Sequence, residues 1–175
     1  MIRKKKNYEK PRKPFEAGRI KDENVLVKKY GLKNKREIWK TIAKVNYFRT
    51  RAKALARSPI EEQEKFFAKL RALGLDVKTS ADVLDLDVES LLDRRLATIV
   101  ANKKLANSMK HARQMIVHKK ITIDGKVMNA PSYIVTLGEE SLIKVKTKNR
   151  VSKKEVEAEV QEAGDVQEDS EEEGE

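Results

Sequence analysis

Cysteine is absent from this chain of 175 residues. Without thiols the chain cannot form disulfide scaffolds, cysteine-ligated zinc sites, iron–sulfur clusters or a cysteine nucleophile. Long apolar runs are missing too, since none approaches the ~18 uninterrupted apolar residues of a membrane-spanning helix. The basic segment 1–6 also lacks the apolar region of a signal peptide. We therefore expect an intracellular, cytoplasmic protein without a membrane partner.

Groups that could perform catalysis are scarce. The two histidines, His111 and His118, lie two turns apart on an expected helix, about 10 Å along its axis. The sequence has no His–Glu zinc motif and no glycine-rich phosphate loop after a strand. Carboxylates stand mostly at expected helix starts or turns, as Asp87 and Asp124 do. These absences predict that the chain is not an enzyme and has no catalytic residue, metal, cofactor or small-molecule substrate.

Charge is abundant and unevenly distributed along the chain. The formal net charge is +11, yet residues 1–57 hold 20 basic against 5 acidic residues, and residues 93–150 hold 13 against 4. Residues 58–92 hold 4 basic against 8 acidic residues, and residues 151–175 hold 2 against 11. Two basic blocks therefore flank an acidic middle. This pattern predicts a polyanionic partner such as RNA.

Both ends of the chain have compositions that disfavour packing. Residues 1–34 form a basic segment whose first part, 1–24, is interrupted by Pro11, Pro14 and Gly18. We expect residues 1–34 to form an extended arm, and residues 1–24 to be disordered in the free protein and ordered on RNA. The acidic tail, 149–175, is expected to be disordered because it has few large apolar residues.

The predicted helical region covers residues 35–90. Apolar residues recur at three- and four-residue steps through an expected helix from Lys35 to Arg57. The other side of that helix gathers Arg36, Lys40, Lys44, Tyr47 and Arg51, which we call the basic stripe. We interpret the basic stripe as a phosphate-binding face, the alternative being a merely solvated surface. A second helix should begin with Ser58 as its cap and end at Gly74.

Residues 91–148 predict a small α+β module. A helix from Val88 to about Lys103 is followed by a second one from Ser108 to near His118. Alternating apolar residues around Asp124-Gly125 then predict a hairpin with a type I′ turn. Residues 133–135 and 142–145 complete a mainly antiparallel sheet. The fold class is therefore α+β, with the module placed between the helical region and the acidic tail.

The start of the second module helix offers several donors to a phosphate. Backbone N–H groups after Ser108 are unpaired at a helix start. Lys110, Arg113 and Gln114 follow with side-chain donors, and Lys103 and Lys104 stand just before it. Such a helix can contact RNA backbone and 2′-hydroxyl groups without reading a sequence.

The order of these residues resembles a known family. SMKHARQMIVH at 108–118, ITIDGKV at 121–127 and PSY at 131–133 are similar to the helix–helix–hairpin RNA-binding module of the ribosomal small-subunit protein four family. Tyrosyl-tRNA synthetases, pseudouridine synthases and a heat-shock ribosome-binding protein carry similar modules. YEKPRKPF at 8–15 and KYGLKNKREIW at 29–39 resemble the archaeal and eukaryotic branch of the ribosomal family. The resemblance runs from about Lys4 to Lys146.

The resemblance implies a structural constituent of the small ribosomal subunit. It implies direct binding to small-subunit rRNA near a multi-helix junction of the 5′ domain and nucleation of the subunit body. It also implies contacts with small-subunit protein five and other small-subunit proteins, and a contribution to translational accuracy. The positions that would contact RNA are Arg94, Lys103, Lys104, Ser108, Lys110, His111, Arg113, Gln114 and His118, to which the basic stripe adds Lys40, Lys44 and Arg51.

Two departures from the family pattern and two other functions remain open. Lys119 stands where the family usually has the glycine that ends the helix, and the acidic tail has no counterpart in the family core. An RNA-modifying enzyme could use the same module for docking, although only residues 1–90 are left for a catalytic domain. A regulator that binds its own messenger could use the same surface.

Overall fold

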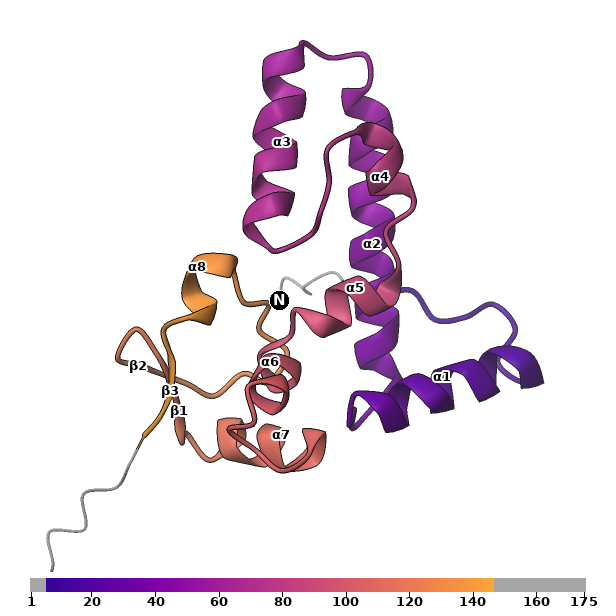
Figure 1. Ribbon diagram of the computed structural model, residues 1–175. Coiled ribbons are helices and arrows are strands. Elements are labelled where there is room, and N and C mark those ends of the chain that lie inside the picture. The colour runs from indigo at the N-terminus through magenta and orange to yellow at the C-terminus, as the bar shows by residue number, and fades with distance from the viewer. Residues whose placement is uncertain (1–5, 147–175) are drawn as a thin grey trace, which may run out of the picture. The chain divides into compact units, whose positions relative to one another are not determined.

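The computed structural model describes residues 6–146 (Figure 1). The predicted acidic tail, 149–175, lies outside the described residues, as do residues 1–5. Most helices come first in the chain and the small sheet lies at its end, as expected of an α+β fold. All of them belong to one unit, Met1–Val145. None of the helices within residues 6–146 has the length and apolar character needed to cross a bilayer.

Helix α1, Ala17–Lys29, occupies part of the predicted extended arm. Its Glu23 is buried, and the carboxylate accepts hydrogen bonds from Arg19 at 2.5 Å and from the Trp39 indole N–H at 2.9 Å. Lys35 completes the ionic contacts at 3.2 Å. The prediction of an extended arm is therefore wrong for residues 17–29, because their charges pair with one another and with the next helix.

Three helices form the predicted helical region. They are α2, Lys35–Leu55, as predicted, α3, Ile60–Ala72, and α4, Ser80–Leu84. Figure 1 shows α3 folding back beside α2, and their shared core includes Val45, Phe48 and Phe66. The predicted Ser58 cap is wrong, because Pro59 takes the N-cap position with extended backbone and Ser58 only accepts a side-chain hydrogen bond from Gln63 through its carbonyl.

The predicted helix from Val88 to Lys103 is interrupted. It forms two helices, α5, Val88–Asp93, and α6, Leu96–Asn102, separated by Arg94 and Arg95. The Leu96 N–H donates to the Tyr133 carbonyl at 2.8 Å, and the Val135 N–H donates to the Arg94 carbonyl at 3.0 Å. The prediction of one helix is wrong because the backbone at the break pairs with residues 133–135. That segment forms only an isolated bridge, Arg95 to Ile134, rather than the predicted strand.

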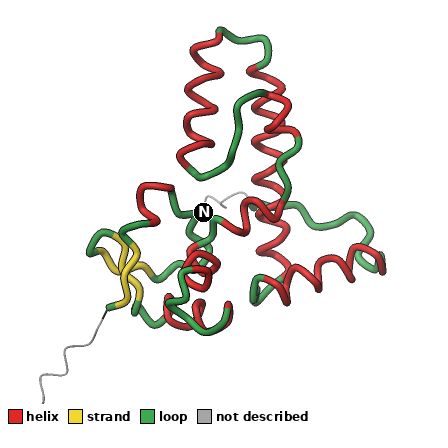
Figure 2. The backbone as a smooth tube through the Cα atoms, viewed as in Figure 1, coloured by secondary structure: helices red, strands yellow, loops and turns green. Residues whose placement is uncertain are grey.

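The rest of the module agrees with the sequence prediction except for the short helix α8, which the sequence did not predict. Helix α7, Met109–Val117, is followed by β1, Ile121–Ile123, and β2, Lys126–Met128, and then by the short α8, Leu137–Glu140, and β3, Ile143–Val145. The strands, yellow in Figure 2, form an antiparallel sheet in the order β2-β1-β3. Asp124 and Gly125 have φ of 50° and 73°, as a type I′ turn requires.

Candidate nucleic-acid interface

A groove lies where the amino-terminal half of α2 meets the module. Its volume is about 970 Å³. Lys40, Lys44 and Tyr47 line it from α2, and Arg95 and Arg113 line it from the module. Lysines from the first basic block and arginines from the second therefore share one concave surface. We call this surface the α2 groove.

The Glu37 carboxylate joins the two sides of the α2 groove. Its two oxygens accept hydrogen bonds from the Arg113 guanidinium at 2.8 and 3.1 Å, and Arg95 donates to one of the same oxygens. The Glu37 side chain is only 17% exposed. Burial alone would raise the pKa of Glu37, but the hydrogen bonds and charges of Arg113 and Arg95 outweigh it and hold that pKa below its usual value. We call these three residues the Glu37 clamp.

Sequence reasoning named Arg113 but missed its partners Glu37 and Arg95. The helical wheel placed Arg113 at the margin of the apolar side of its helix. A guanidinium in such a position needs an acidic partner when the apolar side is buried, because an unpaired buried charge is costly. That requirement was the available signal, but the partner is 76 residues away and only the fold identifies it.

Lys44 lies beside an aromatic ring of the core. Its ammonium lies 6.0 Å from the centre of the Phe48 ring. Burial lowers the pKa of Lys44, because removal of water disfavours the charged form. No described residue forms a hydrogen bond or ion pair with this ammonium. An anion that enters the groove would therefore meet a partly desolvated cation.

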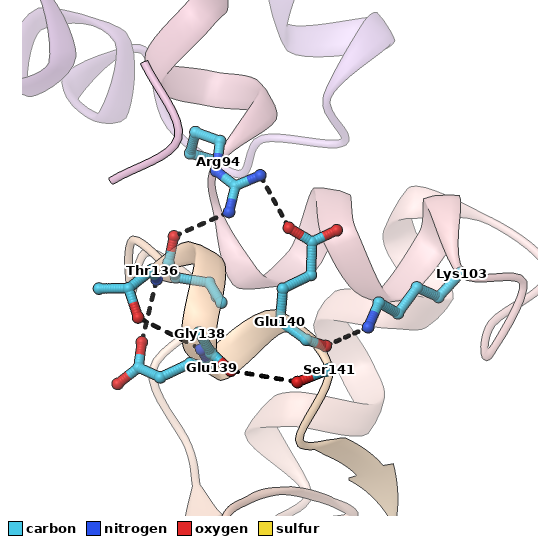
Figure 3. Close-up of polar contacts among 8 residues, drawn as sticks. Arg94, Lys103, Thr136, Gly138, Glu139, Glu140 and Ser141 are labelled. Atoms are coloured by element: carbon cyan, nitrogen blue, oxygen red, sulfur yellow. Dashed lines mark hydrogen bonds and ion pairs between the residues drawn. The ribbon is translucent and has the colours of Figure 1, made fainter. Parts of the chain in front are cut away.

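Arg94 and Lys103, both predicted RNA contacts, are engaged inside the module (Figure 3). Arg94 donates to the Glu140 carboxylate at 2.9 Å and to the Val135 carbonyl at 3.2 Å. Lys103 donates to the Glu140 carbonyl. Figure 3 shows these side chains converging on the segment that contains α8. Their visible role is to hold that segment in place, and a contact with RNA stays a prediction.

Glycine at position 74 makes room for the Arg94 side chain. A Cβ at this position would lie 2.7 Å from the Arg94 Nε and 2.8 Å from its Cζ. Gly74 has φ of 77°, the left-handed conformation that ends α3 as the sequence predicted. The end of α3 at Gly74 therefore lies against the side chain of Arg94, which holds the α8 segment of the module.

The start of α7 uses two of the predicted RNA-binding side chains for its own capping. The Ser108 hydroxyl accepts a hydrogen bond from the His111 N–H at 3.2 Å, as an N-cap residue does. The His111 imidazole accepts one from the Asn107 N–H at 3.3 Å. The predicted helix start at Ser108 is confirmed. Contacts of these two side chains with RNA stay predictions.

The remaining predicted residues are exposed and lie on two surfaces. Lys40 and Lys44 belong to the α2 groove, whereas Arg51 lies further along α2 and does not line it. The other exposed members lie on or beside α7 and make no ion pair within residues 6–146; they are Lys104, Lys110, Gln114 and His118. The structure therefore brings Lys40, Lys44 and Arg113 together but leaves the outer face of α7 as a separate polar surface.

Residues 6–146 offer little other chemistry. No group of three His, Cys, Asp or Glu side chains there is arranged to hold a metal ion. His111 is used at a helix start, and His118 lies exposed at the end of the same helix. The arrangement of the described residues can bind phosphate and ribose groups through lysine, arginine and amide donors.

Comparison with known proteins gives consistent matches. Residues 94–141 match the S4 domain family. The chain is 46% identical over 145 residues to the small ribosomal subunit protein uS4 of Methanococcus aeolicus, covering 79% of this chain and 82% of the relative. It is 44% identical to uS4 of Methanothermobacter thermautotrophicus, covering 79% and 85%, and 42% identical to uS4 of Nanoarchaeum equitans, covering 82% and 84%.

Proposed function

This chain belongs to the family of small ribosomal subunit protein uS4, and from that membership we propose how it engages RNA. As a member it is a structural, rRNA-binding constituent of the small subunit in cytoplasmic ribosomes, and it is not an enzyme. We propose that the α2 groove and the outer face of α7 are its two RNA-contacting surfaces. The proposed RNA contacts therefore include Lys40 and Lys44 on one surface and Lys110 and Gln114 on the other.

One observation supports the α2 groove above all others. Its walls come from α2 and from the module, and cations of both basic blocks line it together. Four cations, Lys40, Lys44, Arg95 and Arg113, line the groove against the single acid Glu37, so the net charge of the groove stays positive. A positively charged concave surface concentrates polyanions, because its field adds up over several fixed charges. For a ribosomal protein, the polyanion in question is the phosphate backbone of RNA.

The two surfaces should contribute differently to binding. Lys40 and Lys44 should hold phosphates irrespective of sequence, since phosphate contacts position a protein without specifying a site. Lys110 and Gln114 should favour the RNA whose shape fits the α7 face. We treat residues 35–90 and 91–148 as the two functional segments that carry these surfaces.

Salt-dependent filter binding tests this division. The full chain and a Lys40→Gln/Lys44→Gln variant would be titrated with a 5′-domain fragment of small-subunit rRNA and with random duplex RNA. Loss of two phosphate contacts should flatten the slope of log K against log salt by roughly 1.5 units on both RNAs. A Lys110→Gln/Gln114→Ala variant should lose more affinity for the 5′-domain fragment than for the duplex.

The matched control is a Lys65→Gln/Lys69→Gln variant of α3. These lysines are exposed and one turn apart, as Lys40 and Lys44 are, but they lie in the acidic middle of the sequence and outside the groove. They should leave the slope unchanged. If the Lys65→Gln/Lys69→Gln variant changes the slope as much as the Lys40→Gln/Lys44→Gln variant does, binding depends on net charge alone and the groove has no special role.

We also propose that the chain nucleates assembly of the subunit body and contributes to translational accuracy beside small-subunit protein five. Family membership supports both roles. In stepwise reconstitution on small-subunit rRNA, omission of this chain should reduce the later binding of small-subunit protein five. Normal recruitment of that protein in its absence would contradict the nucleating role.

A further inference from the structure

Tyr47 is an exposed aromatic residue in the wall of the α2 groove. It is 58% exposed, although α2 buries Ile38, Val45 and Phe48. It follows Lys44 by three residues and Lys40 by seven, which places all three on one face of the helix. A ring left open to water beside two lysines offers a flat apolar surface to a ligand that also carries negative charge.

The ring of Tyr47 is supported from behind. Its centre lies 6.0 Å from that of Phe48, with the planes tilted by 55°, and Phe48 packs in turn against Phe66 with centres 6.5 Å apart. Phe48 and Phe66 are buried. The tyrosine is therefore held by the core of the helical region and needs little ordering when a ligand binds.

Tyr133 lines the same groove but has a different environment. Its hydroxyl donates a hydrogen bond to the Glu139 carboxylate at 2.8 Å, and its side chain is partly buried. Tyr47 has no hydrogen-bond partner within residues 6–146. Of the two tyrosines in the groove, Tyr47 is the one whose ring is available.

We propose that the α2 groove binds an unpaired RNA nucleotide, with its base stacked on Tyr47 and its phosphates held by Lys40, Lys44 and Arg113. The proposal rests on the rRNA-binding function and specifies which kind of RNA element enters the groove. Any anion could use the lysines, but only a base with a free face could use the ring. Bases inside a duplex are stacked on both faces, so the nucleotide must be bulged, looped or extruded.

The first test replaces the ring and keeps the apolar volume. Tyr47→Leu in the full chain should weaken binding to the 5′-domain rRNA fragment roughly five- to hundredfold, because a stacked base is lost. Tyr47→Phe keeps the aromatic face and should stay within about twofold of the original chain, as stacking does not need the hydroxyl. Random duplex RNA should bind equally to all three proteins, since it has no unpaired base to stack.

Ile60 provides the control. It is 73% exposed at the start of α3 and lies outside the groove, so Ile60→Ala removes an accessible apolar side chain without altering the proposed site. It should leave rRNA binding unchanged. Equal losses for Ile60→Ala and Tyr47→Leu would overturn the proposal. Urea unfolding of each variant would verify the fold, which Tyr47→Leu should retain because the tyrosine is largely exposed.

Photochemical cross-linking of the complex with the same rRNA fragment gives a second readout. The peptide that contains Tyr47 should be linked to a nucleotide outside base pairs, and a link to a paired nucleotide would overturn the proposal. If the original chain does not prefer the rRNA fragment to duplex, the rRNA-binding assignment itself fails. If it does prefer the fragment and Tyr47→Leu retains the full affinity, only the nucleotide proposal fails.

Discussion

At the scale of single residues, Lys119 is in a conformation that suits glycine. Its φ is 58°, directly after His118 at the end of α7. The carbonyls of Ile116 and Met115 accept hydrogen bonds from the N–H groups of Lys119 and Lys120, the pattern that closes a helix with a left-handed residue. Lys119 therefore ends the helix in the conformation that a glycine would adopt at this position, at a cost in backbone strain.

Replacing Lys119 by glycine should stabilise the protein. Relief of the left-handed strain exceeds the added backbone entropy of the unfolded chain, so we expect a gain of roughly 0.5–1 kcal/mol in the free energy of unfolding. Urea denaturation would measure it. Lys120→Gly is the control, because Lys120 has a negative φ and should lose stability. A loss on Lys119→Gly would contradict the strain argument.

The Glu37 clamp should contribute measurably to stability. Glu37→Gln should destabilise the chain by about 2–3 kcal/mol at neutral pH, because two arginines lose a charged partner in a partly buried place. Glu89→Gln is the control, since the Lys29–Glu89 pair is about half exposed and should contribute little.

The stabilisation by Glu37 should depend on pH. The pKa of Glu37 is held below its usual value of 4.5 by the two arginines, despite the opposing effect of burial. A carboxyl with a lowered pKa stabilises the fold above its unfolded pKa, and that contribution is lost as the pH falls through the folded pKa. Urea unfolding at about pH 7 and about pH 3 should show the difference between the original chain and Glu37→Gln shrinking. A constant difference would mean that the carboxylate charge is not involved.

At the scale of helices and strands, local signals were sufficient for some elements. Helix α2 has a long apolar stripe, α7 has its Ser108 cap, and the hairpin has Asp124-Gly125 at its turn. Each of these depends on residues that are neighbours in sequence. For that reason the sequence predicted their positions closely.

Other elements depend on distant partners and were missed. Helix α1 is anchored by contacts of Glu23 with Trp39, and the break between α5 and α6 is set by Leu96 pairing with Tyr133. The same holds for the candidate site, because the wheel placed Lys40 and Lys44 on one face but could not show that Arg113 lies across from them. Local sequence patterns do not encode contacts between residues that lie this far apart in the sequence.

The capping of α7 gives a prediction at this scale. Ser108→Ala removes the hydroxyl that accepts the His111 N–H and should cost about 1 kcal/mol of stability, whereas Ser108→Gly should cost only a few tenths, since glycine tolerates the N-cap conformation. Thermal unfolding of both variants would measure this. Indistinguishable stabilities would mean that the hydroxyl is not a cap in solution.

At the scale of the whole molecule, opposite charges are separated along the chain. Residues 151–175 have a net charge of −9, so their deletion would raise the formal net charge from +11 to +20. Binding to random duplex RNA should then strengthen at low salt, because a repulsive segment is removed. Specific binding to the 5′-domain rRNA fragment should be retained.

Filter binding of the shortened and full chains to random duplex would test this. The difference should disappear at about 1 M salt, where the screening length falls to about 3 Å. A large loss of affinity for the 5′-domain fragment on deletion would mean that the tail itself contacts the rRNA. An unchanged affinity for duplex at low salt would contradict the repulsion.

The long sequence separation within the Glu37 clamp has a consequence for the order of events during synthesis. Arg95 follows Glu37 by 58 residues and Arg113 follows it by 76. At roughly 5–20 residues per second, a translating ribosome adds Arg113 about 4–15 s after Glu37. The same delay separates the emergence of the two residues from the exit tunnel, so helices α2, α3 and α4, which precede both arginines in the sequence, can bury their shared core before Arg113 emerges. In the nascent chain α2, with Lys40 and Lys44, therefore folds first. The module side of the α2 groove forms only after α7 has emerged from the ribosome.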